Sequence, residues 1–97
     1  MKYSEMVSNI KISNEIIDIN YDVCEKLIFI HTVHINREHR GQGRFKQLLN
    51  NLQLQHSKPI ELECWPTLIP MYEHLGFKDL GRCWDDYHLM RKEYEEE

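Results

Sequence analysis

The sequence predicts an α/β (α+β) fold in which helices pack against a mixed β-sheet. Three observations carry this prediction: an apolar central segment, two helical patterns, and an element order of strands, helix, strand, helix, strands. A chain of 97 residues has room for one hydrophobic core and one cleft. We therefore expect a single domain over residues 1–97, with its core at 26–92 and an acidic tail at 93–97.

The first strands are expected where isoleucine and aromatic residues cluster. Residues 9–23 contain five isoleucines around Ser13-Asn14, a turn-forming pair, and predict one strand or a hairpin of two. Residues 26–35 have the strongest strand pattern, since their apolar side chains alternate onto both faces. One face takes Leu27, Phe29, Val33 and Ile35, and the other takes Ile28 and Ile30. This pattern predicts a central strand that is covered on each side.

The remaining elements follow in order. Phe45, Leu48, Leu49 and Leu52 have the spacing of an amphipathic helix, predicted over 44–55. A short strand at 60–64 comes next. Two closing strands are predicted at 78–83 and 87–91, joined through 84–86.

A second helix is predicted between the strand at 60–64 and the closing strands. It opens at Pro66, with Thr67 as a capping side chain and Pro70 in the first turn, where no amide donor is required. Gly76 ends it, because glycine accepts a positive φ without steric cost.

Composition narrows the classes of partner. The net charge of −4 repels phosphate backbones, so nucleic-acid binding is disfavoured and cationic amines are mildly attracted. The longest apolar run is far shorter than a membrane span, and the first residues lack the apolar stretch of a signal peptide. We therefore expect no membrane partner and a cytoplasmic location.

The three cysteines are widely spaced and odd in number, and no Cys/His ladder accompanies them. This pattern indicates neither a disulfide framework nor a metal site, and it favours buried free thiols.

Arg40-Gly41-Gln42-Gly43-Arg44 lies between the central strand and the first long helix. A glycine-rich turn at a helix N-terminus directs free amides and the positive end of the helix dipole toward one point, which suits a phosphate or pyrophosphate. A turn that binds nothing is the alternative. The P-loop pattern fails here because Arg44-Phe45 stands where Lys-Ser/Thr is needed, and the dinucleotide pattern fails because Lys46 replaces its third glycine.

This segment resembles the acetyl-CoA motif of the GNAT superfamily of N-acetyltransferases, Arg/Gln-x-x-Gly-x-Gly/Ala, with Arg40 and Gly43 in the first and fourth positions. Phe45 departs from the Gly/Ala of the sixth position, and we expect its ring to turn into the core. The resemblance implies that loop amides hold the CoA pyrophosphate and that strand backbone pairs with the pantetheine arm. The cofactor-binding residues implied are Val33, His34, Ile35, Arg40, Gly41, Gln42, Gly43, Arg44 and Phe45.

A second match lies downstream, where Tyr72-Glu73-His74-Leu75-Gly76-Phe77 resembles the family's Tyr-Glu-Lys-Leu-Gly-Phe motif. The resemblance covers residues 26–92 and implies a GNAT-like acyl-CoA N-acyltransferase fold, a mixed, mostly antiparallel sheet flanked by helices. It also implies that Tyr72 is the general acid that protonates the leaving CoA thiolate, a role that suits a phenol with a pKa near ~10. The alternative is an aromatic side chain that only packs the helix.

His31 is a candidate general base, since some amine acetyltransferases of this family place a base on this strand. Its imidazole can accept a proton near neutral pH, whereas the alternative is a histidine hydrogen-bonded within the sheet. We place it on the face of Val33 and Ile35. Cys64 is a weaker candidate for a covalent acyl carrier, because the sequence offers it no activating partner.

The sequence departs from the family pattern in two places, and these departures leave two functions open. Family members usually begin with a strand and two helices that wall the acceptor site, whereas only about 25 residues, of β character, precede the central strand here. In addition, Trp65 stands where the family often has a cofactor-holding Asn. The chain is therefore expected to be either an acetyl-CoA-dependent enzyme that acetylates a primary amine by direct attack, or a non-catalytic CoA-binding or protein-interaction domain. In a homodimer, a second copy of the chain would supply the missing wall of the acceptor site.

Overall fold

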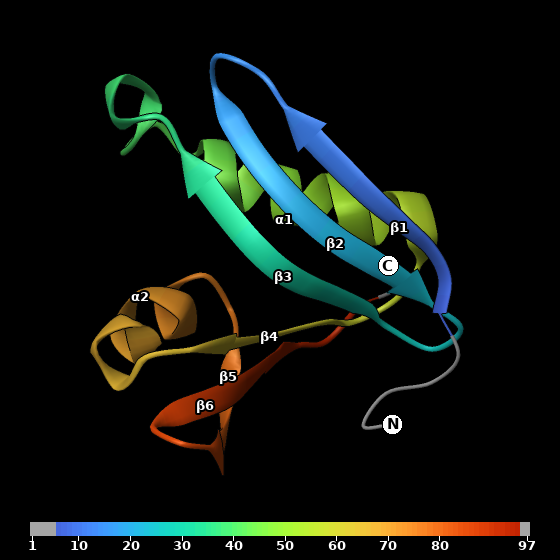
Figure 1. The fold of residues 1–97 in the computed structure, drawn as a ribbon, viewed down its shortest axis with the longest axis vertical. Coiled ribbons are helices and arrows are strands. Elements are labelled where there is room, and N and C mark those ends of the chain that lie inside the picture. The colour runs from blue at the N-terminus through green and yellow to red at the C-terminus, as the bar shows by residue number, and fades with distance from the viewer. Residues whose placement is uncertain (1–5, 96–97) are drawn as a thin grey trace.

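The computed structural model describes residues 6–95 as a six-stranded sheet with two α-helices and two short 3-10 turns (Figure 1). Residues 1–5, in which no signal-peptide stretch is expected, and residues 96–97 of the predicted acidic tail lie outside this range. The elements are β1 (Met6–Ser13), β2 (Ile17–Cys24), β3 (Ile28–Ile35), η1 (Arg37–His39), α1 (Arg44–His56), β4 (Ile60–Cys64), η2 (Pro66–Leu68), α2 (Ile69–His74), β5 (Lys78–Trp84) and β6 (Tyr87–Lys92).

The strand order is β1-β2-β3-β4-β6-β5, and only the β3–β4 pair is parallel. Helix α1 makes the crossover that a parallel pair requires. The first two strands form a hairpin because the Asn14 side chain accepts hydrogen bonds from the amides of Ile16 and Ile17, which closes the turn. The predicted fold class, a mixed and mostly antiparallel sheet flanked by helices, is confirmed.

The sheet opens where β3 and β4 part. These strands pair only between residues 28–30 and 60–62, after which β3 continues along β2 and β4 continues along β6. Figure 1 shows the two strands diverging from their shared start. The divergence creates the space in which the candidate site lies.

A β-bulge in β3 changes which side chains share a face. Tyr21 pairs with Ile30 and Asn20 pairs with Thr32, so His31 is an extra residue in β3. Beyond it the alternation shifts by one, and Val33 packs against the same core as Ile30. The prediction that Val33 and Ile35 lie on the face of Phe29 is therefore wrong, because strict alternation does not anticipate a bulge.

The main hydrophobic core lies between one face of the sheet and both helices. It contains Ile28, Ile30, Ile60 and Leu62 from the central strands, Leu49 and Leu52 from α1, and Tyr72 from α2. On the other face, Phe29 joins a small cluster with Cys24, Leu27 and Leu89. Both faces of β3 are thus buried near its start, as predicted.

The helix predictions agree with the structure in their main features. Helix α1 extends one residue beyond the prediction, Pro70 lies at the start of α2, and Gly76 follows α2 with φ of +99°. The prediction that Thr67 caps this helix is wrong, because the chain enters α2 through the η2 turn and no capping side-chain hydrogen bond forms there.

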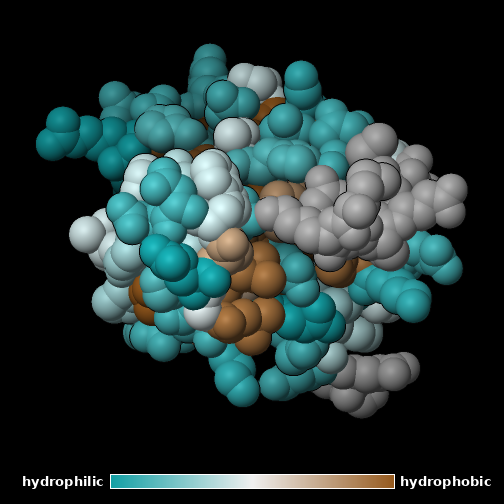
Figure 2. All heavy atoms as spheres, turned by 60° about the horizontal axis from the view of Figure 1, so that its bottom comes forward, coloured by the Kyte–Doolittle hydropathy of each residue, from teal (hydrophilic) through white to brown (hydrophobic). Residues whose placement is uncertain are grey.

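The surface is mainly hydrophilic on the face shown in Figure 2, with a limited apolar area. Within residues 6–95, neither helix is long and apolar enough to cross a membrane. The thiols of Cys24 and Cys64 are free and buried as predicted, whereas Cys83 is exposed.

Candidate active site

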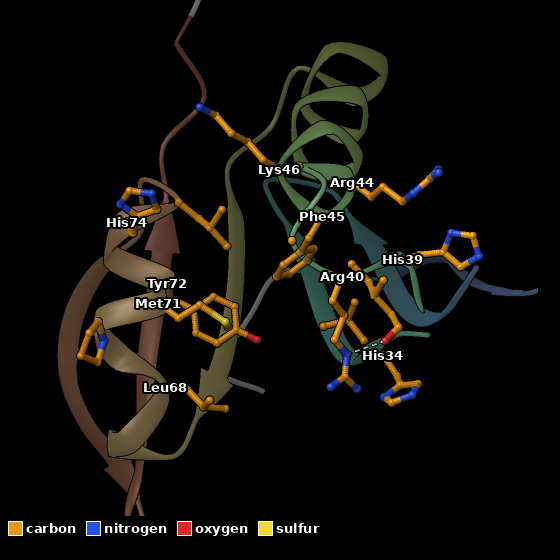
Figure 3. Close-up of a pocket in the computed structure, with 16 residues that line it drawn as sticks. His34, His39, Arg40, Arg44, Phe45, Lys46, Leu68, Met71, Tyr72 and His74 are labelled. Carbon is orange, nitrogen blue, oxygen red and sulfur yellow. Dashed lines mark hydrogen bonds between the residues drawn. The ribbon is translucent and has the colours of Figure 1, made fainter. Parts of the chain in front are cut away.

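A cavity of about 810 Å³ lies between the end of β3, the glycine loop, the start of α1, and α2 (Figure 3). The two helices and the diverging strand bring together the two motifs found in the sequence. The residues that line it are Val33, His34, Ile35, His39, Arg40, Gly41, Gly43, Arg44, Phe45, Lys46, Leu68, Pro70, Met71, Tyr72, His74 and Leu75.

The loop backbone leaves a row of amide donors at this cavity. Gly41 and Gly43 have φ of +75° and +73°, a conformation that other residues adopt only with strain. A Cβ atom at either glycine would meet nothing within 4 Å, so the loop faces open space. In the described part of the chain, no amide from residue 41 to residue 46 donates to another protein group. The positive end of the α1 dipole adds to their attraction for an anion.

The charges on the cavity wall have the same sign. Arg40, Arg44 and Lys46 line it together with three histidines, and none of the described lining residues is acidic. This is a local cationic region on a chain whose net charge is −4. Arg40 is held in place because its Nε donates to the Ile35 carbonyl at 2.8 Å (Figure 3).

Gln42 differs from the other predicted cofactor-binding residues. It does not line the cavity, and its side chain donates to the Glu38 carbonyl at 3.3 Å and accepts from Arg44 Nε at 3.2 Å. Its side chain braces the loop, and only its backbone amide belongs to the row of free donors.

The outer half of β3 has one side free of strand partners. Residues 32–35 pair with β2, and in the described residues no strand pairs with their other side. An extended ligand could therefore hydrogen-bond to the backbone of Val33–Ile35, as a further strand would.

Tyr72 extends from α2 into the cavity. Its ring lies edge-on to Phe45, with centroids 6.1 Å apart, and to Phe77, at 5.4 Å. Figure 3 shows the Tyr72 hydroxyl directed away from α2 toward the β3 side. Burial raises the pKa of Tyr72, and the nearby Cys64 adds to the increase. Phe45 is half-buried against the main core, as expected for the first apolar residue of α1.

A second cavity of about 420 Å³ shares Val33, Leu68 and Tyr72 with the first. The two cavities therefore meet beside the tyrosine. The other lining residues are Ile30, His31, Thr32, Leu62, Glu63, Cys64, Trp65 and Tyr87.

His31 belongs to this second cavity and is paired with a buried carboxylate. Its Nε2 lies 2.7 Å from Asp22 Oδ2, and Asp22 is only 5% exposed. The other carboxylate oxygen accepts from Asn9 Nδ2 at 2.7 Å, and Asn9 also donates to Asn20 Oδ1. This chain of hydrogen bonds orients the imidazole and favours the tautomer with the proton on Nε2.

The prediction that His31 shares a face with Val33 and Ile35 is wrong: the imidazole stays on the side of Phe29 and Asp22, and the bulge moves Val33 to the opposite face. Asp22 and Asn9 were missed. The sequence gives no clear signal for Asp22, because β2 also carries Asp18 and Asn20 at alternating positions.

Aromatic side chains form the far wall of the second cavity. Trp65 and Tyr87 line it with ring centroids 4.3 Å apart, and Trp84 stacks on the same tyrosine at 4.8 Å. Trp65, which stands where the family often has a cofactor-holding Asn, is 45% exposed. Tyr87, Trp84 and the nearby Glu63 were not singled out from the sequence.

Cys64 lines the second cavity but is not suited to covalent catalysis. Burial raises the pKa of its thiol, and Asp79 and Cys83 raise it further. A thiol in this setting stays protonated and is a poor nucleophile. Within residues 6–95, no group of three or more His, Cys, Asp or Glu side chains could hold a metal ion.

No family model and no curated protein matches the sequence. Among solved structures, the chain resembles the anti-CRISPR protein AcrVA5, with a TM-score of 0.67 and 23% identity over 88% of this chain and 98% of that one. A putative acetyltransferase from Agrobacterium tumefaciens matches with a TM-score of 0.73 and 18% identity, over 93% of this chain and 78% of that one.

A third similar structure contains a ligand. The PaiA N-acetyltransferase from Thermoplasma acidophilum, solved in complex with coenzyme A, matches with a TM-score of 0.69 and 17% identity. The match covers 81% of this chain and 54% of that one, so the chain spans about half of its length.

These likenesses establish the class of fold. The sheet and its two helices have the GNAT acetyltransferase architecture, and the recognition made from the two sequence motifs is confirmed at the level of the fold. Because a fold does not fix an activity, the reaction has to be argued from the site.

Proposed function

We propose that this protein is an N-acetyltransferase that transfers an acetyl group from acetyl-CoA to a primary amine. The observation that carries the proposal is the meeting of two cavities at Tyr72, one cationic and one containing the His31–Asp22 pair. A two-substrate transfer needs such an arrangement, since donor and acceptor must reach one another from separate sites.

Acetyl-CoA fits the first cavity by its chemistry. The free amides of the loop and Arg40 and Arg44 suit the pyrophosphate, and the open backbone of residues 33–35 suits the amide groups of the pantetheine arm. The thioester would then lie near Tyr72, where the strands diverge. The N-acetyltransferase of the same fold that was solved in complex with coenzyme A supports this assignment.

The acceptor amine would enter from the second cavity. His31 Nδ1, left without a proton by the Nε2–Asp22 hydrogen bond, would take the proton of the incoming ammonium. The amine nitrogen then attacks the thioester carbonyl carbon, a C–N bond forms, and the C–S bond breaks. The departing sulfur takes a proton from the Tyr72 hydroxyl, and the second proton on the nitrogen passes to the resulting phenolate, directly or through solvent, which leaves an N-substituted acetamide and free CoA and restores Tyr72.

Binding of CoA is the first test of this proposal. Gly43→Glu places negative charge and bulk beside the free amides, and calorimetry should show CoA affinity at least ~10-fold weaker than wild type. Gly81→Glu is the matched control, because Gly81 also has positive φ and open space around it but lies in β5 and outside the cavity. Equal CoA affinity in the two folded variants would contradict the proposed site.

Catalysis is tested separately from binding. Release of free CoA in the presence of primary amines, above the rate without them, is the expected result. A protein that binds CoA and releases none would instead be the non-catalytic CoA-binding domain. Self-association and a cytoplasmic location remain predictions from the sequence.

A further inference from the structure

The wall of the second cavity continues outward as a stack of three aromatic rings. Trp65, directly after β4, lies against Tyr87 with an interplanar angle of 33°, and Trp84 stacks on the same tyrosine at 27°. Trp65 and Trp84 are 45% and 54% exposed. We call these three residues the aromatic ladder. It extends from the cavity, which Trp65 and Tyr87 line, to the tip of the β5–β6 hairpin.

Carboxylates surround this ladder. The indole Nε1 of Trp84 donates to Glu63 Oε1 at 2.9 Å, which fixes the ring and places a carboxylate at its edge. Asp85 and Asp86 are exposed in the turn between Trp84 and Tyr87. The hairpin also carries Arg82, but the acidic groups near the ladder outnumber it.

Aromatic rings with carboxylates beside them favour organic cations as ligands. Electron-rich faces of Trp and Tyr attract organic cations, and the attraction is largest where a cation is partly desolvated. A neighbouring carboxylate adds a charge-assisted hydrogen bond for a group that carries N–H donors. A primary alkylammonium satisfies both, since its methylenes lie on the rings and its N–H groups reach carboxylate oxygens.

We propose that the aromatic ladder, with Glu63, is a binding site for a primary alkylammonium and selects the acceptor of the transfer. The selection of the acceptor rests on the proposed function, in which His31 is the base that receives the acceptor's proton. Glu63 lines the same cavity as His31, which connects the ladder to that site. The half-exposed rings leave the remainder of the ligand in solvent, so a lysine side chain and a free alkylamine share the chemistry required. The alternative is a lid that only shields the core.

The binding test uses the full chain without CoA, so its failure is separable from failure of the proposed function. The protein has two tryptophans, both in the ladder, and therefore two indole N–H signals in a ¹H–¹⁵N spectrum. Titration with n-butylammonium at constant ionic strength should shift both signals saturably, and n-butanol at equal concentration should not. Trp84→Phe identifies the Trp84 signal and should retain binding through its ring.

Two further variants separate the contributions of ring and charge. Trp84→Leu and Glu63→Gln should each weaken n-butylammonium binding roughly 3- to 10-fold, the usual range for an exposed cation–π contact or a screened charge. The Gln carbonyl can still accept from the indole, which keeps the ring in place. Glu25→Gln, an exposed change in the β2–β3 turn, is the matched control and should bind as wild type does.

The sources of the ligand are compared in the same experiment. A lysine tripeptide with blocked ends that binds more tightly than n-butylammonium would identify a polypeptide acceptor, and equal affinities would identify a small amine. Equal shifts with n-butanol, unchanged affinity in both ladder variants, or no saturable shift would overturn the proposal. So would indole shifts that follow protein concentration alone, which would make a second copy of the chain the occupant.

Discussion

Tyr72 is the residue at which the two cavities meet, and its surroundings suit a proton donor. Its ring is fixed between Phe45 and Phe77, and burial raises its pKa, so the hydroxyl keeps its proton at neutral pH. A general acid has to be protonated before it acts, and a CoA thiolate is basic enough to take a proton from a phenol held beside it.

The Tyr72→Phe variant is expected to separate this chemical role from a packing role. It keeps the ring and loses one hydroxyl, so CoA affinity and fold should persist while kcat falls ~10²–10⁴-fold and KM changes little. Tyr21→Phe is the control, since Tyr21 is 3% exposed in the core and lines neither cavity. Stopped assays of CoA release measure both variants. Full kcat in a folded Tyr72→Phe enzyme would remove the tyrosine from the mechanism.

Asp22 acts through His31 and is a positioning residue. Asp22→Asn keeps the size of the side chain but removes the charge that holds the Nε2–H tautomer, so kcat should fall ~10- to 100-fold. Two-bond ¹H–¹⁵N spectra of the imidazole should show a mixture of tautomers in the variant and one in the wild type. Asp18→Asn, an exposed change on the same strand, should alter neither measurement. An unchanged tautomer with a reduced rate would indicate a merely structural effect.

At this scale the sequence predicted the residues that belong to local motifs. The glycines of the loop and Tyr72 lie within short patterns, and the structure brings them to one cavity. Asp22, Asn9 and the aromatic ladder come from strands that meet only after folding. Apart from the Trp84–Tyr87 contact, which spans the tight β5–β6 turn, no spacing within one segment could reveal these contacts, because they depend on how separate strands pair.

At the scale of elements, two irregularities in β3 determine where the site lies. The strand separates from β4 after three paired residues, and the bulge at His31 leaves the imidazole on the face of Asp22 while Val33 turns to the opposite face. A bulge leaves one residue out of the ladder and so shifts the alternation of the residues that follow it. Apolar periodicity predicts that a strand exists but not where its register shifts, which is why the face of Val33 was predicted wrongly.

Helix α1 packs one face against the core and exposes the other to solvent. Leu52 is 3% exposed and Leu54, two residues later, is 73% exposed. Leu52→Ala should lower the free energy of unfolding by ~2–5 kcal/mol, whereas Leu54→Ala should change it by under ~0.5 kcal/mol. Urea denaturation of the two variants measures the difference. Similar losses in both would mean that α1 does not pack on the sheet as described.

At the scale of the molecule, element order and the two motifs were enough to predict the fold class. Every predicted strand and helix has a counterpart with ends within three residues of those expected, because hydrophobic patterning and glycine and proline positions are local signals. The largest differences are at the start of β1, which begins at Met6, and at the start of α2, which begins at Ile69 after the η2 turn. The order of strands in the sheet was not predictable in the same way. It follows from the parallel β3–α1–β4 crossover and the insertion of β6 between β4 and β5, which only long-range packing determines.

The whole molecule should lose stability in alkaline solution, because several buried groups hold their protons more tightly when folded. Burial raises the pKa of the thiols of Cys24 and Cys64 and of the phenol of Tyr72 above their ordinary values of 9.0 and 10.0. As the pH rises through those ordinary values, the unfolded chain releases protons that the folded chain retains, so the free energy of unfolding falls.

Each group contributes a slope of at most roughly 1.4 kcal/mol per pH unit, and only above about pH 9. Urea unfolding at pH 7.0, 8.0, 9.5 and 10.5 should therefore show little contribution from these groups between the first two values and a steady loss across the last two. Cys24→Ala and Cys64→Ala, made one at a time, should each make the fall in the free energy of unfolding with pH less steep. Each variant starts from a lower stability, because the removed thiol leaves a small cavity. A free energy of unfolding that holds constant or rises from pH 8.0 to 10.5 would show that these groups are as accessible to solvent in the folded protein as in the unfolded chain.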